Sequence, residues 1–224
     1  MFEDLKWLGI RWEEGPDVGG PYAPYEQSRR TSFYLDAWRK LLSAGAIYPC
    51  SCSRKDLAAA SQAPHEGILH ATDDEALYPG SCRGRILTAE SPAGINWRFR
   101  VPDGEGISFE DRHLGPQVVV AGRDFGDFVV WRRDDVPAYQ LAVVVDDAAM
   151  KITEVVRGAD LLRSTARQIL LQRALRLPPV EYYHCDLVTD DQGERLAKRH
   201  DALSLRALRA AGKTPQEIQA EWRR

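Results

Sequence analysis

The stretch YQLAVVVDDAAMKITEVVRGADLLRSTARQILLQRALRLPPVEYYHCDLV, residues 139–188, decides the fold class. Its apolar run at residues 139–145 predicts a buried strand, and the apolar segment ITEVV follows at residues 152–156. A Ser/Thr cap precedes a helix predicted at about residues 164–175, and another apolar segment occupies residues 182–188. Alternation of apolar segments with a helix is the βαβ pattern, so we expect an α/β sheet.

Four short segments upstream of this stretch have the character of antiparallel strands. Each is rich in β-branched or aromatic residues and is bounded by Pro, Gly or Asp. A polar segment that ends at about Gly84 precedes them and predicts an insertion rather than part of the core. The four predicted strands are INWRFRV (95–101), GISFEDR (106–112), QVVVA (117–121) and DFVVWRR (127–133).

Helices are predicted towards both ends of the chain. Apolar residues with helical spacing begin at Phe2 and end at Gly9. After a loop rich in Gly and Pro, a strong helix is expected at about residues 26–44, with Phe33 and Trp38 on its apolar side. The other expectations are a short strand or turn at 47–52, a helix at 54–60 capped by Ser53, and a helical segment at 203–224 that breaks at Gly212 and Pro215.

Length and composition indicate one ordinary globular domain, or one domain with an insertion. The chain has 224 residues, 44% of them hydrophobic, which is enough to bury a sizeable core. It contains no run of about 18 apolar residues and no signal peptide, so we expect a cytoplasmic protein without a membrane partner. The net charge of -3 argues against a general affinity for polyanions, so any contact with nucleic acid must come from local patches.

The cysteines favour a metal site over disulfide bonds. Cys50, Cys52 and Cys82 lie close together in the sequence, whereas Cys185 stands apart. Two thiolates one residue apart and a third on a returning loop can form three corners of a tetrahedron. The alternative is that these cysteines are buried free thiols that pack as small hydrophobic residues.

The fourth corner of such a site has several candidates. Tyr78 precedes Cys82 in YPGSC, where a glycine turn could bring its phenolic oxygen to the same point. Histidine is a commoner ligand, and His65, His70 and His113 compete for the position. Spacing alone does not choose among them.

A second group of candidates surrounds Tyr139 and Arg157. Ligands of α/β sheets bind at strand ends, and Arg157 followed by Gly158 would expose a guanidinium group that suits a carboxylate. The alternative reading is a structural salt bridge from Arg157 and a packing role for Tyr139. The carboxylates available for that salt bridge are Asp146, Asp147 and Asp160.

A third candidate is the cationic segment GERLAKRH at residues 193–200. A loop of this kind could close over a polyphosphate, with Lys198 as a mobile positive charge. A solvated basic surface is the alternative. The residues alone therefore indicate a metal-containing α/β protein with an anion site.

Taken in order, these segments resemble the catalytic core of glutamyl-tRNA synthetase, and in particular the short paralogous family of glutamyl-queuosine tRNA(Asp) synthetases. The resemblance covers nearly the whole chain. Its most specific part is the long middle segment. The segments that carry it are EDLKWLGIRWEEGPDVGGPYAPYEQSRR, YPCSCSR with YPGSCR, DFVVWRRDDVPAYQLAVVVDDAAMKITEVVRGADLLRSTARQILL, and GERLAKRH.

The resemblance implies a class I aminoacyl-tRNA synthetase fold, Rossmann-like and α/β, with a zinc-binding insertion. It implies a monomeric ligase that forms glutamyl-adenylate from glutamate and ATP, with Mg²⁺, and transfers the glutamyl group to queuosine in tRNA(Asp). The expected division is a first part of the catalytic domain at residues 1–48, a zinc-binding and β-rich insertion at 49–135, and the second half of the catalytic domain at 136–224.

Site residues follow from the same resemblance. Tyr139 and Arg157 match the residues that bind glutamate, and Lys198 matches the second lysine of the KMSKS loop, which contacts ATP and serves catalysis. Asp160 is a weaker match to a residue at the ATP ribose. The residues that match zinc ligands are Cys50, Cys52, Tyr78 and Cys82.

Two departures from the family pattern stand out. The KMSKS-type loop reads RLAKR at residues 195–199, with Arg for the first Lys and Ala for the central Ser. We also expect the segment with the HIGH-like ATP motif to lie before Met1, so that the chain as given is N-terminally truncated and does not activate glutamate. The alternative function is a catalytically inactive zinc module that retains binding of tRNA or another partner.

Overall fold

The computed structural model describes residues 2–53, 56, 77–187 and 204–222. The chain forms two compact units, one made of Glu26–Asp186 and the other of Met1–Tyr25 with Leu187–Arg224. The predicted division at residues 48 and 135 remains a prediction.

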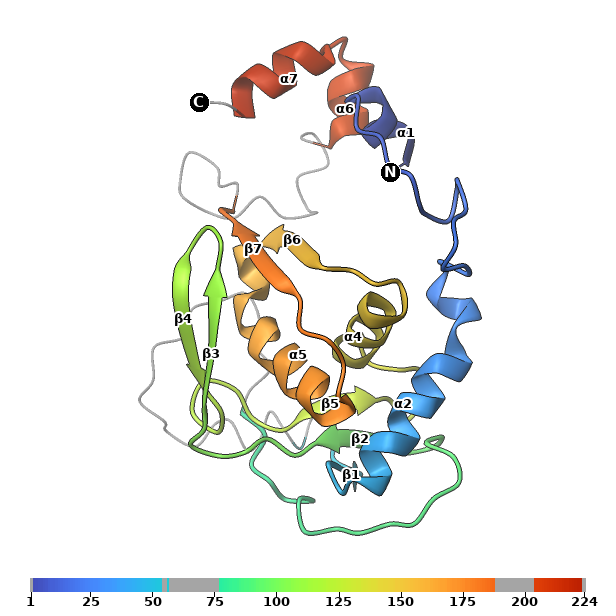
Figure 1. The fold of residues 1–224 in the computed structure, drawn as a ribbon, viewed down its shortest axis with the longest axis vertical. Coiled ribbons are helices and arrows are strands. Elements are labelled where there is room, and N and C mark those ends of the chain that lie inside the picture. Colours follow the sequence, from blue (N-terminus) through green and yellow to red (C-terminus); the bar gives the residue numbers. More distant parts are fainter. Residues whose placement is uncertain (1, 54–55, 57–76, 188–203, 223–224) are drawn as a thin grey trace. The chain divides into compact units, whose positions relative to one another are not determined.

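A four-stranded sheet in the unit Glu26–Asp186 contains the predicted βαβ motif (Figure 1). β6 and β7 are parallel neighbours joined through α5, which confirms the strand–helix–strand prediction. β7 also pairs in parallel with β3, and β3 forms an antiparallel hairpin with β4. The bounds are β3 Gly106–Asp111, β4 Gly115–Val120, β6 Glu154–Gly158, α5 Leu162–Leu175 and β7 Glu181–Cys185.

The predicted strand at residues 139–145 is wrong, because this segment is the first part of helix α4, Tyr139–Ala149. Three consecutive valines favoured a strand by propensity. The buried residues Leu141, Val144 and Val145, however, are three and four positions apart and form one helical face. That face packs between α2 (Thr31–Ser43) and α5, and this packing overrides the local β preference.

The helix predicted at residues 164–175 begins earlier than expected. α5 starts at Leu162, and its N-cap residue Leu161 makes no side-chain capping hydrogen bond. Ser164 and Thr165 are not caps but fully buried residues of the first turns. Their hydroxyl groups are therefore available for contacts inside the protein.

A second, three-stranded sheet has the order β1-β2-β5 and confirms two of the predicted strands and the strand predicted at residues 47–52. The apolar core on this sheet includes three fully buried tryptophans, Trp38, Trp97 and Trp131. Trp38 belongs to α2, which follows the short 3-10 helix η1 (Gln27–Arg29). Phe33 on α2 is 42% exposed, contrary to the predicted apolar side, and Tyr34 is buried in its place. The strand bounds are β1 Ile47–Cys50, β2 Asn96–Phe99 and β5 Phe128–Trp131.

The unit formed by the two chain ends contains three short helices: α1 Phe2–Trp7, α6 Leu205–Ala210 and α7 Pro215–Trp222. The predicted break between the last two is confirmed. Gly212 adopts φ +85°, which favours glycine, and Pro215 is the first residue of α7, where its missing N–H costs no hydrogen bond. Within the described residues, no helix is both long and apolar enough to cross a membrane.

Candidate functional site

Three cysteines and one tyrosine meet at the end of β1. Cys50 is the last residue of that strand and is fully buried, and Cys52 follows it by two residues. Cys82 and Tyr78 approach from a separate segment and are also buried. The three sulfur atoms lie within 4.8 Å of one another.

The distances at this cluster fit tetrahedral coordination. Zinc bonds of about 2.3 Å to sulfur and about 2.0 Å to oxygen give tetrahedral edges of about 3.8 Å between sulfurs and about 3.5 Å between sulfur and oxygen. The Sγ atoms of Cys52 and Cys82 are 3.6 Å apart. The Tyr78 hydroxyl lies 3.4 Å from Cys50 Sγ and 3.5 Å from Cys52 Sγ. Among the described residues, Tyr78 therefore completes a donor set that matches a zinc-sized ion.

Polar groups lie beside the donor atoms and act on them differently. Burial, with the neighbouring thiols, raises the pKa values of Cys52 and Tyr78. Arg98 of β2 is buried, donates from Nε to Cys50 Sγ at 3.3 Å, and lies with its guanidinium 4.1 Å from the centre of the Tyr78 ring. The backbone N–H of Cys82 donates to the Tyr78 oxygen at 2.9 Å. Burial alone would raise the pKa of Cys82, but the neighbouring Tyr78 hydroxyl and the Ser51 backbone lower that pKa to about 6. A thiol with a lowered pKa is a readily available thiolate ligand.

The histidines that competed for the fourth position are elsewhere or not described. His113 is stacked on Tyr183, and its Nδ1 lies 2.7 Å from the carbonyl oxygen of His184, next to the four-stranded sheet. His65 and His70 lie outside the described residues. Ser53 Oγ accepts from the Asp56 N–H at 3.2 Å, and the other residues of the helix predicted at 54–60 lie outside the described residues.

Arg157, on β6, lies at the centre of a second polar cluster. Its Nη1 donates to Gln168 Oε1 at 2.9 Å and its Nη2 to Thr165 Oγ1 at 2.6 Å. Its Nε donates to His184 Nε2 at 3.1 Å, and a longer contact of 3.4 Å joins Nη2 to the Leu161 carbonyl. None of these four partners is a carboxylate. The guanidinium charge is therefore held in place without a carboxylate from these contacts.

The alternative reading of Arg157 as half of a salt bridge to Asp146 is wrong. Asp146 pairs instead with Arg30, whose Nε lies 2.6 Å from Asp146 Oδ1, and it also accepts from the Tyr34 hydroxyl at 2.8 Å. Asp147 has no ion pair with Arg157 within 4.0 Å in the described structure. Burial and the nearby Asp146 charge raise the pKa of Asp147 to about 6.

Tyr139 is the first residue of α4 and is 50% exposed. Its neighbour Gln140 connects this end of the helix to the Arg157 cluster, because Gln168 Nε2 donates to Gln140 Oε1 at 3.0 Å. Gln140 also donates to Ser164 Oγ at 2.9 Å. The Gln140 side chain thus connects the start of α4 to the residues that hold Arg157. The Tyr139 ring remains accessible to a ligand.

The residues that support Arg157 are not among those predicted from the sequence. Thr165 and Gln168 belong to a segment whose hydroxyl residues suggested only a helix cap, and Gln140 lies in the segment predicted as a strand. The helical spacing of three between Thr165 and Gln168 is the signal that could have revealed them, because it puts both side chains on one face of α5.

Two further predictions concern Lys198 and Asp160. Lys198 and the rest of the segment at residues 193–200 lie outside the described residues. Asp160 lies in the short 3-10 helix η2, Ala159–Leu161, and is partly exposed. Neither role is tested by the structure.

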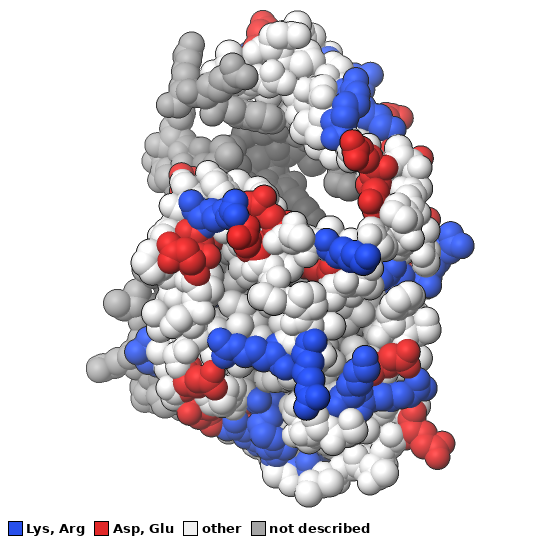
Figure 2. Space-filling view, in the orientation of Figure 1, with Lys and Arg blue, Asp and Glu red and all other residues white. Residues whose placement is uncertain are grey.

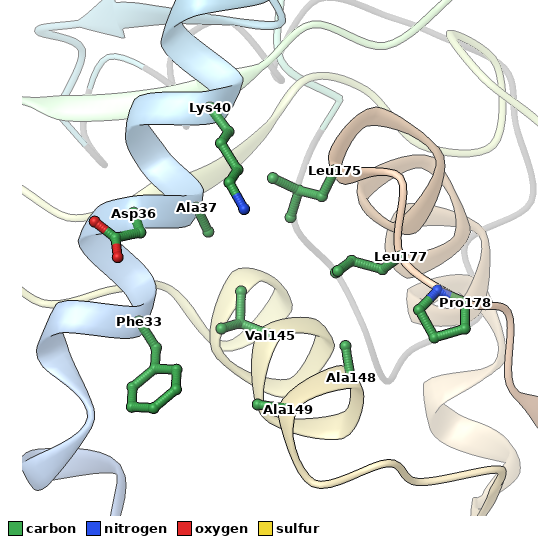
Figure 3. Close-up of a pocket in the computed structure, with 10 residues that line it drawn as sticks. All are labelled: Phe33, Asp36, Ala37, Lys40, Val145, Ala148, Ala149, Leu175, Leu177 and Pro178. Atoms are coloured by element: carbon green, nitrogen blue, oxygen red, sulfur yellow. The ribbon is translucent and has the colours of Figure 1, made fainter.

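A pocket of about 310 Å³ lies between α2, the end of α4 and the end of α5 (Figure 3). Its walls are mostly apolar, and Figure 3 shows Lys40 and Asp36 at its α2 side. None of the site residues predicted from the sequence lines it. The pocket residues are Phe33, Asp36, Ala37, Lys40, Val145, Ala148, Ala149, Leu175, Leu177 and Pro178.

Charged side chains of both signs are interspersed on the face shown in Figure 2, and several Lys and Arg side chains adjoin one another in its lower half. A chain with net charge -3 can therefore still present a local basic patch. Such a patch is the kind of surface on which phosphate groups bind.

Comparison with known proteins gives consistent matches. A family model described as "tRNA synthetases class I (E and Q), catalytic domain" matches residues 1–224. The chain is 50% identical over 221 residues to the Glutamyl-Q tRNA(Asp) synthetase of Symbiobacterium thermophilum, covering 96% of this chain and 66% of that protein. It is 49% identical over 220 residues to the protein of the same name from Nitratidesulfovibrio vulgaris, covering 95% and 65%.

More distant matches carry a related name. Glutamate–tRNA ligase 2 of Nitrosococcus oceani is 40% identical over 233 residues, covering 97% of this chain and 46% of that protein. The crystal structure of glutamate-tRNA synthetase from Elizabethkingia anophelis has a TM-score of 0.71 at 29% identity, covering 90% of this chain and 42% of that one. The chain therefore spans just under two thirds of the length of the first two relatives and less than half of the others.

Proposed function

Because the chain belongs to the class I tRNA synthetases for glutamate and glutamine, whose catalytic domain it matches, we propose that the protein activates glutamate with ATP. In a second step it transfers the glutamyl group to queuosine in tRNA(Asp). The choice of this RNA rests on the two relatives near 50% identity, which are named for tRNA(Asp). The glutamate–tRNA ligases are about 40% identical to the chain. We propose the cytoplasm as the place of action.

The observation that carries the proposal is the Arg157 guanidinium and its partners, none of which is a carboxylate. A guanidinium group has five N–H donors, and the described contacts use four of them, one in the long contact to the Leu161 carbonyl. The second N–H of Nη1 and the weakly bonded N–H of Nη2 can therefore meet a carboxylate. A charge-assisted bond of this kind is roughly twice as strong as a neutral one. We assign the substrate carboxylate to Arg157 and the adjoining contact to the exposed ring of Tyr139.

The ATP site is proposed from the family alone. Lys198 is assigned to the phosphates of ATP, where a positive charge would stabilise the charge that develops as the adenylate forms. Mg²⁺ would accompany ATP. Asp160 remains a weaker candidate for the ribose.

We propose zinc as the ion of the cysteine cluster. Cys50, Cys52, Cys82 and Tyr78 would hold it, and the match of their spacing to a tetrahedron supports the assignment. Four protein donors leave no open position for a substrate, so the metal would be structural and would organise residues 50–82.

Glutamate-dependent exchange of pyrophosphate into ATP tests the first step. In a full-length form of the protein we expect exchange with L-glutamate and none with L-aspartate, because only the longer side chain would carry its carboxylate to Arg157. The second step is tested by transfer of labelled glutamate to tRNA(Asp) with and without queuosine, and we expect label only on the modified RNA. Binding of tRNA(Asp) without any exchange would instead support the inactive zinc module.

A further inference from the structure

His184 of β7 is a fully buried histidine that touches a charged group through each ring nitrogen. Its Nδ1 lies 2.6 Å from Oδ2 of Asp111, and both side chains are inaccessible to solvent. Its Nε2 lies 3.1 Å from Nε of Arg157. The strand register explains the contact, because Arg157 and His184 are direct partners across β6 and β7.

Asp111, at the end of β3, is held as a carboxylate. Its Oδ1 accepts from three backbone N–H groups, those of His113 at 3.0 Å, Leu114 at 2.9 Å and His184 at 3.3 Å. Burial alone would raise the pKa of Asp111, but the bonds from the Leu114 backbone and the His184 ring lower that pKa to about 2. Oδ2 is therefore an ionised acceptor that faces the imidazole.

These two neighbours fix the position of the imidazole proton. A carboxylate accepts only, so the proton of His184 belongs on Nδ1, where it can be donated to Asp111. Arg157 Nε–H donates only, so His184 Nε2 must be an acceptor and carry no proton. Thr165 Oγ1 also lies 3.2 Å from Nε2 and can serve either tautomer, because a hydroxyl group both donates and accepts. The opposite tautomer would still point an N–H at Arg157 and a lone pair at the carboxylate, and would lose the bonds to Arg157 and Asp111.

We propose that His184 and Asp111 are positioning residues for the substrate carboxylate, because the carboxylate of Asp111 fixes the tautomer in which His184 accepts from Arg157. This inference rests on the proposed role of Arg157 in binding glutamate. With its Nε edge held by His184, the guanidinium turns the Nη edge, which carries the available N–H groups, towards the ligand. Neither residue contacts the ligand itself.

A structural role for the same residues predicts different behaviour. The Asp111–His184 bond could instead serve only to attach the β3–β4 hairpin to β7. In that case a substitution that breaks the contact at Nδ1 would impair the protein, and one that breaks only the contact at Nε2 would not. Two substitutions separate these contacts. His184→Gln can keep an acceptor near the position of Nε2, whereas His184→Asn can keep only the donor near the position of Nδ1.

The experiment measures binding of L-glutamate to the whole chain by calorimetry, with Arg157→Ala as the reference for complete loss. We expect His184→Gln to bind glutamate nearly as well as the unchanged protein. We expect His184→Asn to bind about 10- to 100-fold more weakly, as displaced positioning groups do. The reverse order, or equal binding by both folded variants, would overturn the inference.

Asp111→Asn provides an independent test. The three backbone N–H groups require the amide oxygen at the position of Oδ1, so the NH₂ group faces His184 and forces the imidazole proton onto Nε2. Glutamate binding should therefore weaken although the side chain keeps its size. Long-range ¹H–¹⁵N NMR should show a protonated Nδ1 in the unchanged protein and a protonated Nε2 in the variant. A protonated Nε2 in the unchanged protein would refute the inference.

Failure of the proposed function would look different. If Arg157→Ala left glutamate binding unchanged, Arg157 would not be the carboxylate site. The NMR assignment of the His184 tautomer, and the presence of a protected Arg157 Nε–H signal in His184→Gln but not in His184→Asn, would still decide whether Asp111 and His184 orient the guanidinium.

Discussion

At the scale of single residues, Asp147 carries its carboxyl group where a negative charge is costly. Burial is the largest cause of its raised pKa of about 6, and the neighbouring Asp146 charge adds to it. Because the pKa is higher in the folded than in the unfolded state, folding favours the protonated form. The cost of the charge is therefore small near pH 4 and fully present above about pH 6.

Asp147→Asn should accordingly stabilise the protein at neutral pH. A pKa raised from 3.8 to about 6 corresponds to about 2–3 kcal/mol at pH 7.5, and less than about 1 kcal/mol should remain at pH 4. Urea unfolding of both proteins at the two pH values measures this difference. Asp36→Asn on the surface of α2 is the matched control and should change little at either pH.

Arg157 allows a second prediction at this scale. In a form of the protein that activates glutamate, Arg157→Ala should weaken glutamate binding by roughly 2–5 kcal/mol, because the substrate carboxylate would be left unpaired in a partly dry site. The Michaelis constants for glutamate and for ATP measure the effect, and only the first should rise steeply. Arg173→Ala, which removes an exposed arginine of α5 paired with Glu105, should leave both constants unchanged.

At the scale of elements, a buried ion pair joins Arg30, the residue between η1 and α2, to α4. Arg30 is 1% exposed and pairs with Asp146 of α4, which Tyr34 and Gln27 also contact. Removal of one partner leaves the other charge buried and uncompensated. The pair therefore links the segment around η1 to the helix that begins at Tyr139.

Arg30→Ala should destabilise the protein by about 3–5 kcal/mol, the usual cost of breaking a buried pair. The exposed pair between Arg39 and Asp36 within α2 gives the control, because Arg39→Ala should cost no more than about 1 kcal/mol. Chemical denaturation measures both. Similar losses in the two variants would mean that the pair between Arg30 and α4 adds nothing beyond a surface contact.

The cysteine cluster predicts a metal content that can be measured directly. Purified protein should contain about one zinc per chain, and Cys50→Ala or Cys82→Ala should lose it. Cys185→Ala is the control, because this cysteine lies on β7 away from the cluster and its loss should leave the zinc content unchanged. A protein without zinc, or variants that keep it, would count against the assignment.

Most helices and strands were predicted correctly from the sequence. The prediction was wrong where tertiary contacts decide between helix and strand. Short strands such as Phe128–Trp131 have strong β-branched and aromatic patterns, and the break between α6 and α7 has Gly and Pro at the expected positions. Helix α4 was missed because its valines favour strand locally, and only packing against α2 and α5 decides for a helix. The family resemblance found from the motifs is confirmed by the comparisons.

Only part of the candidate site was predicted from the sequence, because contacts between distant segments leave no local pattern. The spacing of Cys50, Cys52 and Cys82 favoured a metal site over disulfide bonds and left free thiols as the alternative, and the structure brings all three together. His184 and Asp111, by contrast, are 73 residues apart and meet only because β3 and β7 are neighbours in the sheet. No local pattern marks them, so sequence reasoning passed over both.

At the scale of the whole molecule, most of the buried apolar residues that the structure describes belong to two clusters. The larger one surrounds the tryptophans of α2, β2 and β5, and the smaller one consists of Tyr48, Tyr78 and the cysteines of the metal site. A metal bound in the smaller cluster therefore contributes little packing to the larger one.

Removal of zinc should consequently leave the main core folded. With a strong chelator present, we expect the near-ultraviolet circular dichroism of the buried tryptophans to persist while the thiols of the cluster become reactive to a thiol reagent. The same reagent added without chelator serves as the control, and should find mainly Cys185. Loss of the tryptophan signal together with the metal would show instead that the two clusters unfold as one.

A redesign of this protein for a different amino acid will require substitutions as distant as the hairpin of β3 and β4. A library that varies only the residues lining the substrate keeps the guanidinium of Arg157 in its present orientation, because Asp111 and His184 still hold it. Exchange of Arg157 for a neutral side chain alone would leave a buried aspartate and an imidazole that keeps only Thr165 near its Nε2. A successful change of amino acid preference should therefore carry companion substitutions at positions 111 and 184, far outside the shell that a designer would first randomise.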